Sequence, residues 1–432
     1  MKRSGRKYWD FSSLKINERI ATLKDYVQKN PRELKKGYIN LHIHTNESFS
    51  VFKSPTEAVW YAYREDIEYF GINDHYTIDG HDEFRLACEV AGIKPTFSIE
   101  AIAMDEEAFR SRRRYNDPNN PGRCYLIGKG VVRRLLPGGR GERLLRSLTG
   151  SIRERNRKIT EKLNRYLEDH GFHLVLSYDE VEALTPRGNT TERHVVQALC
   201  ERLNREFTNL KIRKQVYSEL LKCDVDENTL LDKARLLTLV REKLVKIDRP
   251  CYVEEDPSAF TSIQNLVELY LEYGSVPTYP FMGNPITEVE EDLEALISRV
   301  MRNCLYALDI IDYRTEVWRA REIIEVASHY GLPVFIGTEH NTKDMVPLVG
   351  PVASQPEFDE YFRRSANFVI GHQVMERLCN FGAVTPEGRP RFEDMREGFQ
   401  FYTSIGEMNL SRQQIEELEK NNLAERKRFF HI

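Results

Sequence analysis

Short apolar runs alternate with helical patterns along much of the chain, and several of these runs end in polar side chains. Residues 38–45 read Tyr-Ile-Asn-Leu-His-Ile-His-Thr, an alternation typical of a strand. Successive side chains on a strand face opposite ways, so His42 and His44 share a face, about 7 Å apart along it. That spacing suits one metal ion, although a lone His-x-His pair also fits two surface histidines on an edge strand. Other motifs in the chain are needed to distinguish a metal site from two surface histidines.

Three more predicted strands end in side chains that bind metals. Residues 70–73 predict a short strand that ends at Asp74 and His75, and residues 95–99 predict one that ends at Glu100. Residues 332–337 predict a strand followed by Glu339 and His340. Helical patterns separate these strands, which favours a parallel α/β sheet with its ligand site at the carboxyl ends of the strands.

Two insertions interrupt this rhythm and divide the chain into predicted parts. We expect a leading helical segment over residues 1–35, with its helix from about 10 to 34, and a first barrel part over 36–201. The first part contains an arginine-rich insertion at 104–150, a strand near 124–128 and a strand or extended piece at 172–177. A charged helical insertion or lid follows at 202–275, then the second barrel part at 276–370 and a helical C-terminal extension at 371–432.

Net charge, apolar stretches and cysteine spacing limit the binding partners and the cellular compartment that we expect. The 432 residues carry a net charge of −4, which gives no general indication of nucleic-acid or membrane binding, although a nucleic-acid partner stays open. The basic start is not followed by an apolar run, and no stretch is apolar enough to span a bilayer. The seven cysteines are scattered and form no Cys-x-x-Cys pair. A reduced cytoplasm is therefore expected.

Taken in order, these motifs resemble those of the PHP family, named for its polymerase and histidinol phosphatase members. The resemblance rests on residues 41–45, 73–75, 98–100 and 337–341, with support from residues 153–159, 192–199 and 331–334. It implies an α/β fold, a distorted (β/α)7 TIM-like barrel with a helical insertion and helical N- and C-terminal extensions. It also implies divalent metal ions (zinc, manganese or iron), of which one is expected and up to three are allowed.

Position by position, the resemblance assigns the metal ligands. The first site would use His42, His44, Glu100 and Glu339, where Glu339 stands in place of the family's usual Asp. The second site is damaged, because the places of its two histidines hold Tyr125 and Tyr279, and neutral tyrosine is a poor ligand for zinc or manganese. The third site would use His75, but its other places hold Phe49 and Asn341. Nearby Glu47 and His340 could substitute there.

The implied function is hydrolysis of a phosphoester by a metal-activated water. Asp74 or His75 would act as the catalytic acid or base, and Lys129, Arg193 and His194 would hold oxygens of a phosphorylated small molecule or nucleotide. His194 lies in the first turn of a predicted helix. There it could bind metal, bind phosphate or simply cap the helix.

Two other readings of the chain stay open. In the first, it is a degenerate PHP-like protein that binds a phosphorylated ligand or a partner without catalysis. In the second, it is an interaction protein whose helical insertion and tail matter most. Measurements of bound metal and of phosphate-ester hydrolysis would distinguish the hydrolase, the non-catalytic binding protein and the interaction protein.

Overall fold

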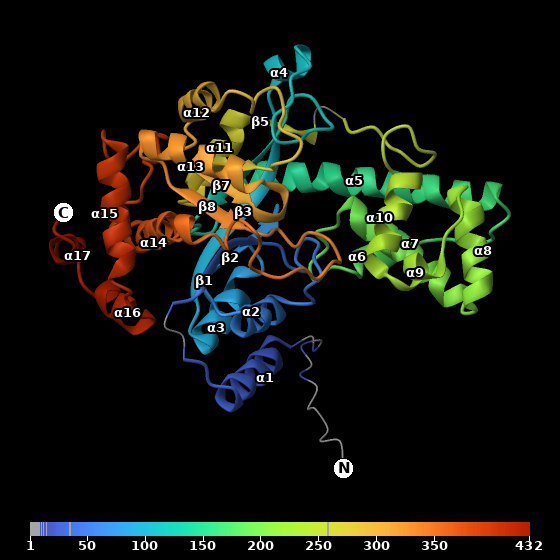
Figure 1. Cartoon of the computed structure of the whole chain (residues 1–432), viewed down its shortest axis with the longest axis horizontal. Coiled ribbons are helices and arrows are strands. Elements are labelled where there is room, and N and C mark those ends of the chain that lie inside the picture. Colours follow the sequence, from blue (N-terminus) through green and yellow to red (C-terminus); the bar gives the residue numbers. More distant parts are fainter. Residues whose placement is uncertain (1–8, 10, 12, 14, 34–35, 257–258) are drawn as a thin grey trace.

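A barrel-shaped sheet, flanked by helices and by a separate helical lobe, forms the centre of the protein (Figure 1). This computed structural model describes residues 9, 11, 13, 15–33, 36–256 and 259–432. The main strands are β1 (Tyr38–Ile43), β2 (Ile67–His75), β3 (Lys94–Met104), β4 (Arg123–Lys129), β6 (Val276–Phe281), β7 (Ala307–Ile311) and β8 (Val334–Gly337). The helices around them are α2 (Pro55–Arg64), α3 (His81–Ala91), α11 (Ile263–Glu272), α12 (Leu293–Arg302), α13 (Val317–Tyr330) and α14 (Pro356–Cys379).

The seven strands follow the order β1-β2-β3-β4-β6-β7-β8, and the short β5 (Thr261–Ser262) pairs with β3. The first and last strands of this order, β1 and β8, also meet each other. The backbone N–H of Glu339 donates to the carbonyl of His42 at 2.9 Å, and that of His44 donates to the carbonyl of Glu339 at 2.7 Å. A Cβ on Gly337 would lie 2.3 Å from the Cβ of His42, so only glycine allows β8 to approach β1 this closely. The predicted seven-stranded barrel is confirmed.

Strand β4 departs from the predicted parallel arrangement, because it runs antiparallel to both β3 and β6. The segment between β3 and β4 contains only the five-residue α4 (Glu106–Arg110), which is too short to carry the chain back along the barrel as a crossover helix does. The chain therefore re-enters the sheet from the same end. As a result, Lys129 at the end of β4 pairs with Ser98 of β3, two residues before Glu100.

A helical lobe lies beside the barrel and has its own apolar core (Figure 1). Its helices are α5 (Arg140–Asp169), α6 (Tyr178–Glu182), α7 (Glu192–Glu206), α8 (Leu210–Leu221), α9 (Glu227–Leu231) and α10 (Lys233–Leu244). The buried side chains of this core run from Ile159 to Cys251 and include Phe49 from the barrel. The lobe thus begins before residue 202, while α11, inside the predicted insertion, packs on the barrel strands. Residues 172–177 lie in this lobe and form no strand.

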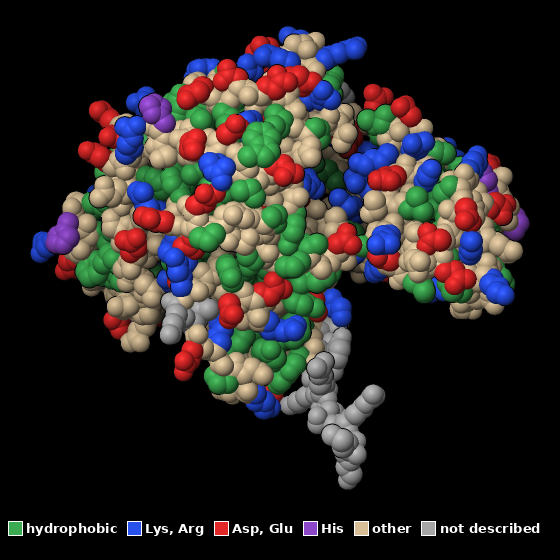
Figure 2. Space-filling view, viewed as in Figure 1, with side chains coloured by type: hydrophobic (Ala, Val, Ile, Leu, Met, Phe, Trp, Pro, Cys, Tyr) green, Lys and Arg blue, Asp and Glu red, His purple; other side chains and the backbone are tan. Residues whose placement is uncertain are grey.

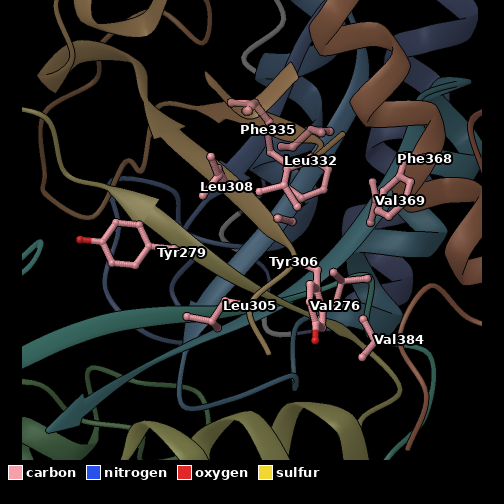
Figure 3. Close-up of a cluster of buried hydrophobic side chains, with 14 of the residues drawn as sticks. Val276, Tyr279, Leu305, Tyr306, Leu308, Leu332, Phe335, Phe368, Val369 and Val384 are labelled. Atoms are coloured by element: carbon pink, nitrogen blue, oxygen red, sulfur yellow. The ribbon is translucent and has the colours of Figure 1, made fainter. Parts of the chain in front are cut away.

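Helices at both ends of the chain cover the barrel. Helix α1 (Ile16–Lys29) packs on α2 and α3, whereas residues 10 and 34, the expected limits of that helix, lie outside the described residues. Near the C-terminus, Phe368 and Val369 of α14 join an apolar cluster with Leu308 and Phe335 of the strands (Figure 3). The predicted boundary at residue 371 falls inside α14.

Three smaller helices complete the C-terminal part: α15 (Met395–Glu407), α16 (Arg412–Lys420) and α17 (Leu423–Phe429). All seven cysteines are free thiols. Within the described ranges, none of the helices combines the length and the apolar character that a bilayer crossing requires.

Candidate metal centre

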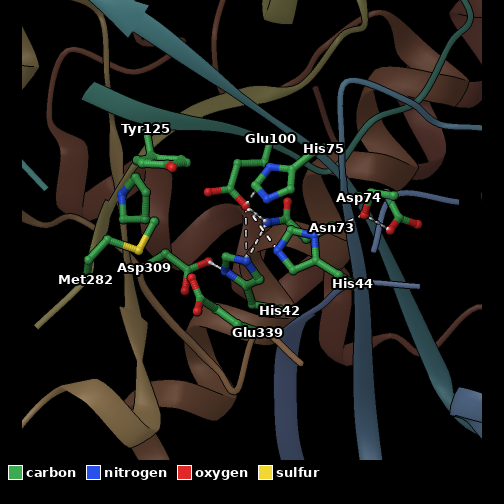
Figure 4. Close-up of polar contacts among 12 residues, drawn as sticks. His42, His44, Asn73, Asp74, His75, Glu100, Tyr125, Met282, Asp309 and Glu339 are labelled. Atoms are coloured by element: carbon green, nitrogen blue, oxygen red, sulfur yellow. Dashed lines mark hydrogen bonds and ion pairs between the residues drawn. The ribbon is translucent and has the colours of Figure 1, made fainter. Parts of the chain in front are cut away.

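Two histidines and a glutamate from neighbouring strands meet inside the mouth of the barrel (Figure 4). The Nε2 atoms of His42 and His44 lie 3.4 and 3.3 Å from Oε2 of Glu100, and all three side chains are fully buried. One ligand atom from each residue lies within 4.8 Å of the other two. Strands β1, β2 and β3 are adjacent and parallel, so residues near their carboxyl ends come together at one height. This arrangement joins positions 58 residues apart in the chain into one possible ligand set.

Several polar atoms at this point have no hydrogen-bond partner among the described residues. They include His44 Nε2, His75 Nδ1 and Glu100 Oε1. Buried polar atoms are almost always paired, so a group of unpaired ones facing a common point calls for a bound species. Imidazole nitrogens and a carboxylate are ligands that zinc, manganese and iron accept. The donor set therefore fits a divalent metal ion.

A buried ion pair lies directly beside this cluster. The carboxylate of Asp309, on β7, is 2.5 Å from Nζ of Lys129 and 3.5 Å from Nδ1 of His42. Lys129 also donates to the carbonyl of Leu41 at 2.7 Å. Asp309 thus contacts the ring nitrogen of His42 that faces away from Glu100. A carboxylate in this position orients a metal-binding imidazole and raises its basicity.

The charges in this buried region leave room for one more cation. Glu100 and Asp309 supply two negative charges, because nearby cationic groups hold the pKa of each carboxyl below its usual value despite burial. Lys129 balances one of them. Burial lowers the pKa of His42, but Asp309 and Glu100 more than offset this and raise that pKa to about 9. A metal ion held by His42 and Glu100 would balance the second charge.

The position of Asp309 leads to a prediction for Asp309→Asn. The amide keeps the shape of the side chain but removes the charge that supports His42, so metal affinity is expected to fall by about 10- to 100-fold without loss of a ligand. Competition with a fluorescent chelator measures this. Asp312→Asn is a suitable control, because the Asp312 carboxylate accepts backbone N–H groups of residues 350, 352 and 353 instead. Wild-type affinity in Asp309→Asn would contradict the assigned role.

His75 and Asn73 complete the wall of the cluster. The His75 ring lies 4.3 Å from that of His44, and its side chain is 19% exposed, whereas those of His42, His44 and Glu100 are fully buried. Burial and the charge of His44 lower the pKa of His75 to about 4, which leaves the imidazole neutral near pH 7. The amide nitrogen of Asn73 lies 2.7 Å from His42 Nε2 and 3.1 Å from Glu100 Oε2. His75 is thus the member of the group that solvent can reach.

The carboxylate of Asp74, which follows Asn73, points away from the cluster (Figure 4). It accepts hydrogen bonds from the backbone and hydroxyl of Thr45, at 2.7 and 2.6 Å, and from the hydroxyl of Ser48 at 2.6 Å. It therefore fixes the loop after β1. Glu47 of the same loop pairs with Arg187 at 2.7 Å.

Residues 337–341, the last of the predicted motifs, shape the site mainly through their backbone. Glu339 and His340 both have positive φ, 62° and 53°, which turns the chain sharply after β8. Glu339 lies near His42 in Figure 4, but its Oε2 pairs with Arg314 at 3.0 Å. The ring nitrogens of His340 lie 2.8 Å from the Thr338 hydroxyl and 3.0 Å from the Val346 carbonyl. The ligand atoms that lie within 4.8 Å of one another belong to His42, His44 and Glu100. Glu339 lies beside them, and its charge acts on His44 and His75.

Two of the three side chains predicted to bind substrate lie near the start of α7. Arg193 lies beside Phe49, with its guanidinium carbon 5.8 Å from the ring centroid. His194 accepts from the backbone of Thr191 at 3.0 Å and caps α7, the third of the roles left open by the sequence. Lys129, the third predicted residue, is fully buried in its pair with Asp309.

Tyr125 and Tyr279, which stand where the second metal site would need histidines, lie in different surroundings. The Tyr125 ring lies 6.3 Å from that of His75, while Tyr279 donates to Glu290 at 2.9 Å, on the outer side of its strand. Two residues near the cluster, Asp309 and Asn73, are absent from the set predicted from sequence. One feature of the sequence indicates Asp309, because it directly follows the apolar run of residues 305–308.

Comparisons with known proteins show similarity at the level of solved structures. No family model matches the sequence, and no curated protein matches it. A proposed metal-dependent phosphoesterase from Bifidobacterium adolescentis is 15% identical, with 73% of this chain and 92% of that one covered and a TM-score of 0.49. An amidohydrolase from Chromobacterium violaceum, with bound sulfate and no metal, is 16% identical, with 75% and 95% covered and the same TM-score.

Proposed function

We propose that this protein is a metal-dependent phosphoesterase of the PHP type, with its metal held by His42, His44 and Glu100. The observation that carries the proposal is the buried group of His42, His44 and Glu100 at the barrel mouth, in which His44 Nε2 and Glu100 Oε1 have no hydrogen-bond partner among the described residues. When bound, the ion would supply positive charge for the phosphate oxygens and a water of lowered pKa. Zinc, manganese and iron all suit this donor set.

The chain's own side chains supply the remaining functions. His42 is oriented by Asp309, whose charge is itself balanced by Lys129. His75 lies at the solvent side with a free Nδ1, 3.8 Å from Glu100, where it can take up or release a proton. Asp74 holds the loop after β1 through Thr45 and Ser48, and so acts on the site by positioning. Arg193 provides a cation for an anionic substrate.

Reconstitution with metal tests the proposal. The purified protein is treated with a chelator, dialysed, and loaded separately with Mn²⁺, Zn²⁺ or Fe²⁺ before assay with p-nitrophenyl phosphate. We expect one ion per chain and hydrolysis that disappears with the chelator and returns with metal. A protein that retains no metal, or whose hydrolysis is insensitive to the chelator, contradicts the proposal.

One observation favours a second candidate, a protein that binds a phosphorylated ligand without turning it over. Within the described ranges, the group of His42, His44 and Glu100 is the one metal-type cluster found, and Phe49 and Tyr125 stand where further ligands would be needed. Binding of phosphate without turnover in the metal-loaded protein would select this candidate.

A further inference from the structure

The helical lobe is joined to the barrel mouth by residues 187–189, a short segment between α6 and α7. Figure 2 shows the surface hollowed between the barrel and the lobe, so the contacts that bridge the two parts are of interest. Arg187 donates to Oε1 of Glu47 at 2.7 Å and to the carbonyl of Asp79 at 3.1 Å. Glu47 lies in the loop after β1, and Asp79 lies in the loop after β2. One guanidinium thus ties both loops to the lobe.

Asn189 makes a second bridge between the same two loops. Its side-chain nitrogen donates to the carbonyl of Glu47 at 2.9 Å and to the carbonyl of His75 at 2.8 Å. A side-chain amide carries two N–H donors, so both donors of Asn189 are used here. Asn189 is therefore the residue of the lobe that bonds directly to the solvent-side histidine of the proposed metal centre.

The carbonyl of His75 faces a side of β2 where the sheet has ended. The C=O of His75 and the N–H of Tyr76 belong to one trans peptide and point opposite ways. That N–H donates to the carbonyl of Glu100, on β3, at 2.8 Å. The His75 carbonyl therefore points toward the side of β1, but β1 ends at Ile43, which pairs with β2 three residues earlier. Asn189 supplies the donor that a longer neighbouring strand would have supplied.

The ring of His75 has few contacts of its own to hold it. Within the described ranges, no hydrogen bond to either ring nitrogen is found, and Nδ1 lies 3.8 Å from Oε2 of Glu100. The ring packs beside that of His44, with 4.3 Å between the centroids. The placement of this imidazole thus depends mainly on its backbone, which Asn189 holds from the lobe.

We propose that Asn189 is a positioning residue, through which docking of the helical lobe sets the place of the His75 imidazole at the metal centre. The inference rests on the proposed function, because it acts through the proton transfer assigned to His75. A displacement of about 1 Å at a reacting group can cost about a hundredfold in rate. In this role the lobe is a fixed part of the active site.

Kinetics of Asn189→Ala in the Mn²⁺-loaded protein test the inference. The substitution removes both donors but touches none of the proposed metal ligands. We expect kcat for p-nitrophenyl phosphate to fall by about tenfold or more, with KM and the one bound ion unchanged. Asn189→Asp, which keeps the shape and loses the donors, should act in the same way. In a His75→Gln background, Asn189→Ala should cause little further loss, because the two residues act together. Equal losses in both backgrounds would overturn the inference.

The histidine ring signals of the metal-free protein give a second readout, independent of catalysis. The His75 signal is identified by its absence from the NMR spectrum of ¹³C-histidine-labelled His75→Gln. We expect it to shift or broaden in Asn189→Ala and to stay in place in Asn164→Ala. Asn164 is the matched control, because its amide donates to the Leu176 carbonyl at 3.0 Å inside the lobe. Thermal unfolding confirms that each variant is folded.

An unchanged His75 signal in folded Asn189→Ala, or an unchanged kcat, would overturn the inference. A His75 signal that moves equally in Asn164→Ala would also overturn it, since any loosening of the lobe would then suffice. Failure of the wild type to bind metal or to hydrolyse the ester would instead count against the proposed function, and the ring signals would still report on the position of His75.

Discussion

Glu100→Gln is expected to remove metal binding and to reduce phosphoester hydrolysis by about a thousandfold or more, since the bound ion supplies several kcal/mol of transition-state stabilisation. The carboxylate of Glu100 is the negative ligand around which both imidazoles gather. An amide of the same shape fills the space but lacks the charge that a divalent ion needs. Metal analysis after dialysis and a phosphatase assay measure the two effects.

The control for this variant is Glu290→Gln. Glu290 is also buried, and burial raises its pKa to about 7, but its carboxylate bonds to Tyr279 outside the cluster. This control should bind one ion and retain hydrolysis. If Glu100→Gln binds metal as the wild type does while remaining folded, Glu100 is not a ligand and the proposed centre is wrong.

Lys129→Met is expected to destabilise the protein by about 3–5 kcal/mol, the cost of leaving a buried charge without its partner. Both Lys129 and Asp309 are fully buried, and their charged atoms lie 2.5 Å apart. Without the ammonium, the Asp309 carboxylate would depend on His42 alone. Urea unfolding at pH 7 gives the change in the free energy of unfolding.

The double variant Lys129→Met, Asp309→Asn tests whether the two charges stabilise the protein as a pair. Removing both charges avoids the unpaired carboxylate, so the double variant should lose less free energy of unfolding than the sum of the two single variants. Additive losses would show that the pair does not act as a unit. In that case Lys129 would stabilise the fold through its bond to the Leu41 carbonyl instead.

The part of the centre that could be predicted from sequence comes from adjacent parallel strands. His42 and His44 share a strand face by simple alternation, and Glu100 reaches them because β1, β2 and β3 are neighbours with parallel register. The rhythm of strands and helices places such side chains at one end of a sheet.

The remaining positions depend on features that the pattern does not encode. Strand β4 looks like any other short apolar run, but its antiparallel direction puts Lys129 level with Ser98 inside the barrel rather than at its mouth. Glu339 and His340 both have positive φ after β8, and their side chains contact Arg314 and the Val346 carbonyl. Asp309 stood out only as an acidic residue after apolar ones, and its partners come from distant strands.

Diffraction data collected on either side of the absorption edge of the bound metal would locate the ion. We expect one anomalous peak per chain, enclosed by Nε2 of His42, Nε2 of His44 and the carboxylate of Glu100. A peak elsewhere in the molecule, or no peak in crystals grown with excess Mn²⁺ or Zn²⁺, would contradict the proposed metal centre.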